Sequence, residues 1–139
     1  MAEIHTGSCN CGGVRLRTTG KLREVIYCHC SQCRKQTGLY YAATNIGDAE
    51  LEVEGADNIT WYQSSDFAKR GFCKVCGSAL FWKARDHDYT SIMAGLFDSP
   101  TGLAASVHIF AADKGDFYAI ADGLPQYDRS TPSVKVPGD

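Results

Sequence analysis

The sequence has no strong excess of charge of either sign and no long hydrophobic run. Its 14 lysines and arginines stand against 16 aspartates and glutamates, and the positive residues are scattered along the chain. A nucleic-acid-binding protein needs a basic patch, so we expect no nucleic acid partner. No stretch is long enough to cross a bilayer, and the N-terminal residues lack the features of a signal peptide. We therefore expect a cytoplasmic protein without membrane association.

Low-complexity tracts and internal repeats are also missing, and helical periodicity is scarce. The chain has 139 residues, of which 44% are hydrophobic and 22% charged, as in a soluble globular protein. A chain of this length buries roughly two thirds of its unfolded surface, which is enough for one core. We predict a single domain over residues 1–139, with its core at about 7–128 and a loose tail at 131–139.

Alternation of apolar and polar residues predicts an all-β protein. Leu51 and Val53, for example, alternate with three glutamates. Further strands are expected around residues 14–17, 24–28, 40–46, 59–63, 79–83, 90–94 and 106–111. One short helical turn fits the segment SQCRKQTG, with Ser31 as its N-cap and Gly38 at its end.

Cysteine is abundant, and all seven residues fall into three clusters. The clusters are a C-x-C pair, a C-x-C-x-x-C triplet and a C-x-x-C pair: Cys9 and Cys11; Cys28, Cys30 and Cys33; Cys73 and Cys76. A disulfide between partners one residue apart would be strained, and disulfides are rare in a reducing cytoplasm. Such clusters therefore favour metal ligation or catalysis. Zinc takes four ligands in tetrahedral geometry, and each short pair supplies half of such a set.

The spacing alone leaves the grouping of the ligands open. Two pairs make a closed four-cysteine site and leave three cysteines for a site with an open position. The N-terminal pair can join the C-x-x-C pair, which leaves the central triplet open. It can also join Cys28 and Cys30, which leaves Cys33, Cys73 and Cys76 as the open set. A further alternative, buried apolar cysteines without metal, is disfavoured by the clustering.

Four segments of the chain carry a family resemblance. In chain order they read GSCNCGGVRL, YCHCSQCRKQTG, GFCKVCGSALFW and SVHIFAADKGDFYAIADGLPQYD. Together they resemble the glutathione-dependent formaldehyde-activating enzyme family over about residues 7–128. The resemblance implies a tent-like all-β fold of twisted antiparallel sheets, built around zinc-binding turns, with two zinc sites. It assigns a structural zinc to Cys9, Cys11, Cys73 and Cys76, and a catalytic zinc to Cys28, Cys30 and Cys33.

The activity implied by the resemblance is that of a carbon–sulfur lyase, an S-(hydroxymethyl)glutathione synthase. Such an enzyme joins the thiol of glutathione to formaldehyde or cleaves the adduct. An open zinc site suits this chemistry, because the metal can bind a small thiol and favour its thiolate form. Arg34 and Lys35 directly follow the triplet, where a cation can pair with a carboxylate of glutathione.

Two other classes of function compete with this interpretation. A non-catalytic zinc module that binds a protein partner gains nothing from an open zinc position, so the triplet favours an enzyme. A thiol redox enzyme needs a nucleophilic cysteine free of metal, and the grouping leaves none.

We do not expect three of the histidines, His29, His87 and His108, to be metal ligands. His29 lies between two cysteines of an extended segment and should point to the opposite face, as a hydrogen-bonded structural residue. His108 lies in the middle of a strand and fits either a packed core position or a pocket. His87 lies between two aspartates in a turn, where a solvated loop is expected.

Overall fold

The computed structural model describes residues 3–131, which fall into two compact units. Unit 1 comprises residues 3–23 and 44–103, and unit 2 comprises residues 24–43 and 104–131. The predicted loose tail lies outside the described residues except for Thr131, which is buried. That the whole chain forms a single domain stays a prediction.

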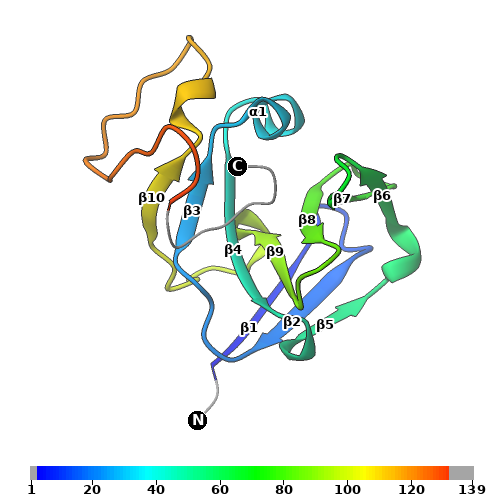
Figure 1. Cartoon of the computed structure of the whole chain (residues 1–139). Coiled ribbons are helices and arrows are strands. Elements are labelled where there is room, and N and C mark those ends of the chain that lie inside the picture. Colours follow the sequence, from blue (N-terminus) through cyan, green and yellow to red (C-terminus); the bar gives the residue numbers. More distant parts are fainter. Residues whose placement is uncertain (1–2, 132–139) are drawn as a thin grey trace. The chain divides into compact units, whose positions relative to one another are not determined.

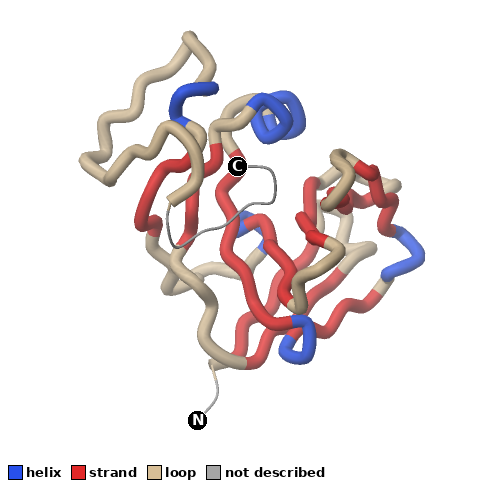
Figure 2. Tube along the Cα trace, in the orientation of Figure 1, coloured by secondary structure: helices blue, strands red, loops and turns tan. Residues whose placement is uncertain are grey.

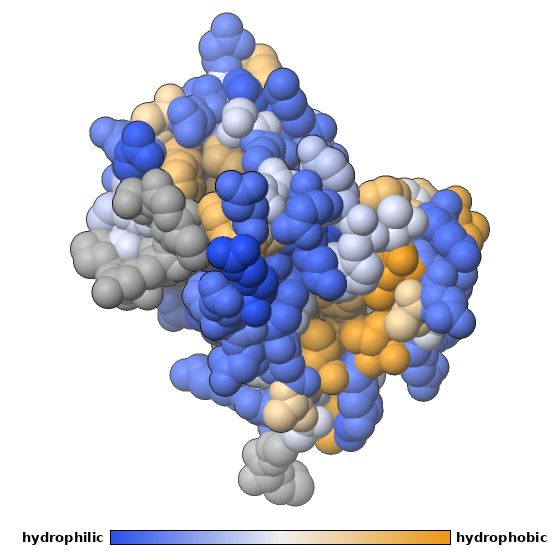
Figure 3. Space-filling model, turned by 45° about the vertical axis from the view of Figure 1, so that its right-hand side comes forward, coloured by the Kyte–Doolittle hydropathy of each residue, from blue (hydrophilic) through white to orange (hydrophobic). Residues whose placement is uncertain are grey.

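Strands are the main regular elements of the described residues, although loops make up much of unit 2 (Figure 2), so the prediction of a mainly β protein is confirmed. Over residues 3–131 the one α-helix is α1 (Ser31–Thr37). No helix in this part of the chain has the length and apolar character that a membrane crossing requires. The face in Figure 3 shows both hydrophilic and apolar residues at the surface.

Unit 1 contains a small antiparallel sheet of three strands (Figure 1). Its order is β1 (Ile4–Ser8), β2 (Arg15–Thr19) and β5 (Leu51–Glu54). Leu16 lies opposite Val53 in the β2–β5 pair, so the apolar residues of both strands face the same side. The apolar residues of β2 and β5 thus lie on the same face of this sheet.

A second set of antiparallel strands in unit 1 follows the order β9, β8, β7, β6. The strands are β9 (Tyr89–Met93), β8 (Ala79–Ala84), β7 (Ala68–Cys73) and β6 (Ile59–Gln63). Three short 3-10 turns also lie in this unit: η1 (Asp48–Glu50) before β5, η2 (Ala56–Asn58) before β6 and η3 (Ala94–Leu96) after β9. At the end of β7, Cys73 pairs with Ile59 of β6, which fixes the position of the C-x-x-C turn.

The core of unit 1 is formed by apolar side chains from both sets of strands. It consists of Cys9, Val14, Leu16, Leu22, Ile46, Cys73, Leu80, Phe81, Ile92 and Phe97. Burying each large aliphatic or aromatic side chain stabilises a fold by roughly 1.5–3 kcal/mol. Two cysteines belong to this core, so their sulfurs are held by packing on one side.

Unit 2 contains β3 (Val25–Cys28), α1, the start of β4 (Tyr41–Gly47), β10 (Ala105–Ile109) and η4 (Ala111–Asp113). β3 pairs antiparallel with β4, with Cys28 opposite Tyr41. β10 runs parallel to β3, with His108 opposite Tyr27 and Ile109 opposite Cys28. This sheet is therefore mixed, with one parallel pair beside the antiparallel ones. A parallel pair needs a long connection, which the chain between β3 and β10 supplies.

The predicted helix is present, but its N-cap differs from the expectation. Ser31 is the first helical residue, and Cys30 is the N-cap, because its sulfur accepts a hydrogen bond from the Cys33 N–H at 3.4 Å. Gly38 ends the helix in the left-handed region at a φ of 85°, as predicted. The thiol has taken the capping role that serine usually fills, so the triplet and the helix start are one structural feature.

Candidate functional site

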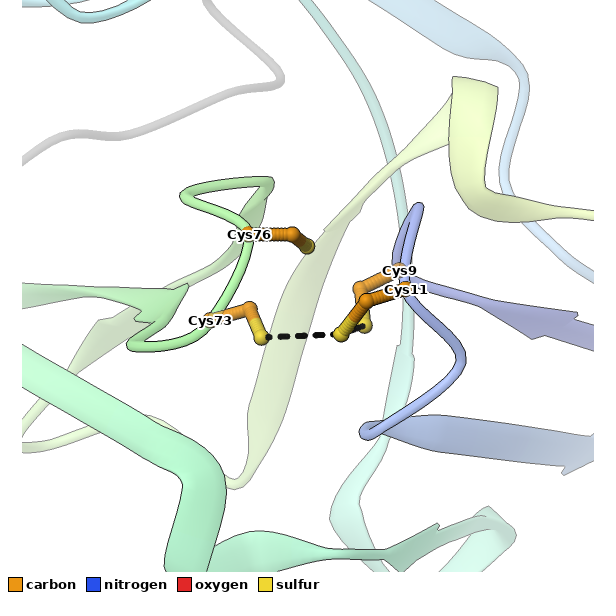
Figure 4. Close-up of side chains that lie close together, drawn as sticks. All are labelled: Cys9, Cys11, Cys73 and Cys76. Atoms are coloured by element: carbon orange, nitrogen blue, oxygen red, sulfur yellow. Dashed lines mark hydrogen bonds between the residues drawn. The ribbon is translucent and has the colours of Figure 1, made fainter.

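Four cysteines of unit 1 gather at one point, two from the N-terminal segment and two from the end of β7 and its turn. Figure 4 shows Cys9 and Cys11 pointing toward Cys73 and Cys76. The Sγ atoms of Cys9 and Cys11 are 3.6 Å apart, and those of Cys11 and Cys73 are 3.7 Å apart. All four sulfurs lie within 4.8 Å of one another. Tetrahedral zinc–sulfur bonds of about 2.3 Å require sulfurs about 3.8 Å apart, so this donor set fits zinc.

Tight turns with glycine hold both pairs in place. The Gly12 N–H donates to the carbonyl of Cys9 at 3.1 Å, and the Gly77 N–H donates to the carbonyl of Cys73 at 2.8 Å. These glycines have φ angles of 80° and 79°, in the left-handed region that other residues rarely adopt. The glycine that follows each pair is thus needed to turn the backbone around the sulfurs.

Hydrogen bonds to sulfur favour the thiolate form of Cys9 and Cys76, whereas at Cys11 the hydrogen bond from the Gly13 N–H is outweighed by the neighbouring thiols, which raise the pKa to about 11. The backbone N–H of Val14 donates to Cys9 Sγ at 3.3 Å. The side chain and the backbone of Ser78 lower the pKa of the Cys76 thiol to about 5. Thiolates are the form that binds metal ions, so these polar groups prepare Cys9 and Cys76 for ligation.

Two residues near the four cysteines were not identified as site residues from the sequence. The hydroxyl of Ser78 lies 3.2 Å from Cys76 Sγ. The side-chain N–H of Asn58 donates to the carbonyl of Gly13 at 2.9 Å, and its own carbonyl accepts from the Lys74 N–H at 2.8 Å. Asn58 thus ties the two cysteine turns together. Ser78 directly follows the CKVCG turn, which is a weak signal, and Asn58 gives none, because its contacts depend on the tertiary fold.

The second cysteine group lies within unit 2, where β3 passes into α1. Cys28 ends β3, Cys30 caps the helix and Cys33 lies in the first helical turn. Their three sulfurs lie within 4.8 Å of one another, with Cys33 buried and the other two half-buried. Hydrogen bonds with the Cys30 and Cys33 thiols raise the pKa of Cys28 most, and burial and repulsion from the neighbouring thiolates raise it further. A cation would relieve that repulsion, so this donor set also fits a metal ion.

The structure therefore brings together one of the two groupings that the spacing allowed. The N-terminal pair joins the C-x-x-C pair, and the triplet stands by itself. The alternative, in which Cys33, Cys73 and Cys76 form the open set, is wrong. Within the described part of the chain, two groups of cysteines are thus close enough to hold metal ions.

The two basic residues after the triplet differ in exposure. Arg34 is half-buried on α1, whereas Lys35 is exposed. Burial raises the pKa of the Tyr118 phenol, and the charge of Arg34 opposes that rise. Arg34 therefore acts electrostatically on the region around Tyr118 beside the triplet, while Lys35 faces solvent.

The burial and contacts of His29, His108 and His87 agree only in part with the expectations from the sequence. His29 has 0% exposure and hydrogen-bonds to Tyr118 and His108, so its predicted hydrogen-bonded role is confirmed. Burial lowers the pKa of His29 to about 4, and the charges of His108 and Lys114 add to this. His108 is itself buried. His87 lies in the turn between β8 and β9, as predicted, but it is half-buried and stacks on the ring of Tyr89.

Comparisons with known proteins agree with the cysteine pattern. A family model described as glutathione-dependent formaldehyde-activating enzyme matches residues 4–113. A Halomonas elongata protein, provisionally named as such an enzyme, is 33% identical over 127 residues, covering 82% of this chain and 79% of its own. A Schizosaccharomyces pombe protein named as an uncharacterized lyase is 28% identical over 124 residues, covering 85% and 86%. A crystal structure of a Rhodobacter sphaeroides protein has a TM-score of 0.56 at 24% identity, covering 87% of this chain and 98% of its own, and has a similar fold.

Proposed function

Because the chain belongs to the glutathione-dependent formaldehyde-activating enzyme family, we propose that it is a zinc-dependent carbon–sulfur lyase. Its substrates would be a small thiol, glutathione, and a small aldehyde, formaldehyde, together with their adduct in the reverse direction. The observation that carries the proposal is the triplet of Cys28, Cys30 and Cys33. Three sulfurs gathered at one point are one donor short of a closed tetrahedral set, as expected of a reactive zinc site.

The two cysteine groups would have different tasks. We propose that Cys9, Cys11, Cys73 and Cys76 hold a structural zinc and that the triplet holds a catalytic zinc. The four-cysteine group supports this division, because it offers a complete ligand set and joins segments far apart in the sequence. Structural zinc adds its binding free energy to folding, on the order of 10 kcal/mol in small domains.

The proposed reaction balances without an oxidant or reductant. The thiol loses its proton, the sulfur forms a bond to the aldehyde carbon, and the carbonyl electron pair moves to the oxygen, which gains a proton. A bound zinc ion supplies a positive charge that favours the ionised form of the substrate thiol. Arg34 and Lys35 would pair with carboxylates of glutathione and so hold the thiol beside the triplet.

The seven free thiols support a cytoplasmic protein in this proposal. Cysteines that serve as metal ligands must stay reduced, and the reducing cytoplasm keeps them so.

Elemental analysis and exchange-sensitive NMR test the proposal. The purified protein should hold up to two zinc ions per chain, one lost quickly and one slowly under mild chelation. The zinc-loaded protein should accelerate exchange between glutathione with formaldehyde and S-(hydroxymethyl)glutathione at equilibrium. A folded protein that binds no zinc would contradict the whole proposal. Zinc binding without turnover of any thiol would favour a non-catalytic interaction module.

A further inference from the structure

A buried chain of hydrogen bonds runs through unit 2 beside the triplet. The Tyr118 hydroxyl lies 2.6 Å from His29 Nδ1, His29 Nε2 lies 2.8 Å from His108 Nδ1, and His108 Nε2 lies 2.8 Å from Asp122 Oδ2. The two imidazoles are 0% and 2% exposed, whereas the Asp122 side chain is 41% exposed. The chain thus connects a half-buried phenol to a carboxylate in contact with solvent.

The carboxylate at one end fixes the direction of the hydrogen bond from His108, and the tautomers of the two histidines set the direction of the other two bonds. The Leu124 N–H donates to Asp122 at 3.0 Å and is the largest contribution that lowers the pKa of this carboxyl, so it stays ionised. A carboxylate only accepts, so His108 donates from Nε2 to Asp122, and in the arrangement that we propose its other ring nitrogen, Nδ1, accepts from His29. In that arrangement His29 donates from Nε2 and accepts at Nδ1. The Tyr118 hydroxyl therefore donates inward, and its oxygen lone pairs point away from His29.

Several contacts place this phenol next to the candidate reactive site. His29 is the residue between Cys28 and Cys30, and its backbone N–H donates to the carbonyl of Ile109 at 3.0 Å. The ring of Tyr118 stacks on His29 with centroids 5.6 Å apart. The charge of Cys28 contributes to the raised pKa of Tyr118, after burial as the main cause. The phenol and the triplet therefore share one region of unit 2.

Further contacts hold the phenol in a fixed orientation. The Lys114 ammonium lies 4.7 Å from the centroid of the Tyr118 ring and donates to the backbone carbonyls of Gly115 and Tyr118. Tyr40 packs against both His29 and Tyr118, with centroids 5.0 Å and 6.1 Å away. The side chains of His29, Lys114 and Tyr40 thus restrict the orientation of the half-buried Tyr118 ring.

We infer that Tyr118 is the catalytic residue that exchanges a proton with the aldehyde oxygen of the substrate. His29, His108 and Asp122 are positioning residues that set the direction of its hydroxyl. This inference rests on the proposed thiol–aldehyde reaction. It adds the residue that exchanges a proton with the oxygen atom of the aldehyde. The substrate group it recognises is the hydroxyl of an S-hydroxymethyl adduct, or the oxygen of the aldehyde in the forward direction.

The proton balance of the step follows from the direction of the chain. In cleavage, the Tyr118 oxygen takes the hydroxyl proton of the adduct while its own proton passes to His29 Nδ1. His29 hands its Nε2 proton to His108 and so stays neutral. The added charge rests on His108, facing the Asp122 carboxylate. At the substrate, the oxygen electron pair forms the carbonyl, the carbon–sulfur bond breaks, and the sulfur leaves as thiolate. Addition is the reverse.

Three zinc-loaded variants test the inference: Tyr118→Phe, Asp122→Asn and the control Tyr127→Phe, which removes the hydroxyl of an exposed tyrosine. Exchange NMR with glutathione and formaldehyde should show that Tyr118→Phe lowers kcat about 100-fold in both directions, with the glutathione KM within about twofold of the parent. Tyr127→Phe should leave both parameters unchanged. Zinc counts and thermal melts show whether each variant is folded.

A second readout is independent of turnover. Nitrogen NMR of labelled histidines in the parent should show His29 and His108 both neutral and protonated at Nε2. Asp122→Asn should change that tautomer pattern and lower kcat about tenfold or more, because the fixed acceptor is lost. Protonation of His29 at Nδ1 in the parent would overturn the inference.

Different results would contradict the role of Tyr118 and the proposed function. An active parent with an equally active, folded Tyr118→Phe variant overturns the inference alone. A parent that turns over no thiol overturns the proposed function, and the role of Tyr118 with it.

Discussion

The hydroxyl oxygen of Ser78 lies 3.2 Å from the sulfur of Cys76. The same oxygen accepts a hydrogen bond from the backbone N–H of Asn10 at 3.1 Å, which leaves the hydroxyl proton to point at the sulfur. One serine thus connects the two turns that carry the four-cysteine group and favours the thiolate of Cys76.

Ser78→Ala should therefore weaken zinc binding at the four-cysteine group. Without the hydroxyl, the pKa of Cys76 should rise from its value of about 5. Loss of such an outer hydrogen bond typically lowers metal affinity about 10- to 100-fold. Competition with a chromophoric chelator measures the tight zinc. Ser64→Ala, which removes a hydroxyl bonded to the Ala68 carbonyl, serves as the control and should leave this affinity unchanged.

The turn at Gly55 predicts a steric effect of substitution. Gly55 has a φ of 80°, and a Cβ placed there would lie 2.0 Å from the carbonyl oxygen of Gly13, next to the first cysteine pair. Gly38 has a φ of 85° but nothing within 4 Å of such a Cβ. Gly38→Ala should cost about 1–2 kcal/mol from backbone strain alone. Gly55→Ala should cost roughly 3 kcal/mol or more, since backbone must move. Urea unfolding of both variants measures the difference, and equal costs would contradict the close contact.

The Asp48 carboxylate predicts a pH dependence of stability. Burial would raise the pKa of Asp48, but hydrogen bonds from Lys83 and Thr90 outweigh it and hold the pKa below its usual range. A carboxyl with a lowered folded pKa stabilises the fold above its unfolded pKa, near 4, and loses this effect as the pH falls through the folded pKa. Unfolding free energy should therefore fall below about pH 4.

Lys83→Met tests this origin. It should raise the Asp48 pKa, seen by carbon NMR of the carboxyl, and reduce stability at pH 7 by about 1 kcal/mol or less, since Asp48 is 42% exposed. The matched control is Arg85→Met, which removes the more exposed pair with Asp86. That variant should have no measurable effect on stability. An unchanged Asp48 titration in Lys83→Met would contradict the assignment.

Arg34 and Lys35 should differ in their contribution to thiol binding. Arg34 is half-buried beside the triplet, whereas Lys35 is exposed. A guanidinium paired with a carboxylate is among the stronger polar contacts, so Arg34→Met should raise the Kd for glutathione about tenfold. Lys35→Met should raise it about twofold at most, because solvent screens its charge. Calorimetric titration of both zinc-loaded variants measures the difference, and equal effects would remove Arg34 as the carboxylate partner.

The fold was predictable where the apolar pattern was regular. The strands over residues 59–63 and 79–84 match the expected segments closely. β1 and β7 were not predicted, since β1 reads IHTGS and β7 is interrupted by Lys69, Arg70 and Gly71. Arg70 is buried in spite of its charge. Gly71 leaves room for the Trp61 ring, which would lie 3.0 Å from a Cβ at this position. Both features suppress the alternation from which strands are recognised.

The candidate site was predictable only as far as local spacing reached. The cysteine clusters carry their own signal, because adjacent thiols have few other uses. The proximity of His29, His108 and Asp122 has no local signal. It arises from the parallel pairing of β3 with β10, in which His108 lies opposite Tyr27. Sequence periodicity indicates which residues face one side of a strand, but not which distant strand lies beside it.

The division into a closed and an open cysteine group is the central claim, and zinc content per folded chain in two variants tests it most directly. Cys33→Ser removes one of three sulfurs, whereas Cys76→Ser removes one of four from the group that joins two distant turns. We predict that Cys33→Ser stays folded and keeps its slowly released zinc while losing glutathione binding. Cys76→Ser should lose that zinc and melt far below the parent, since structural zinc contributes on the order of 10 kcal/mol. A Cys33→Ser protein that unfolds, beside a Cys76→Ser protein that keeps its tight zinc and its activity, would contradict the account.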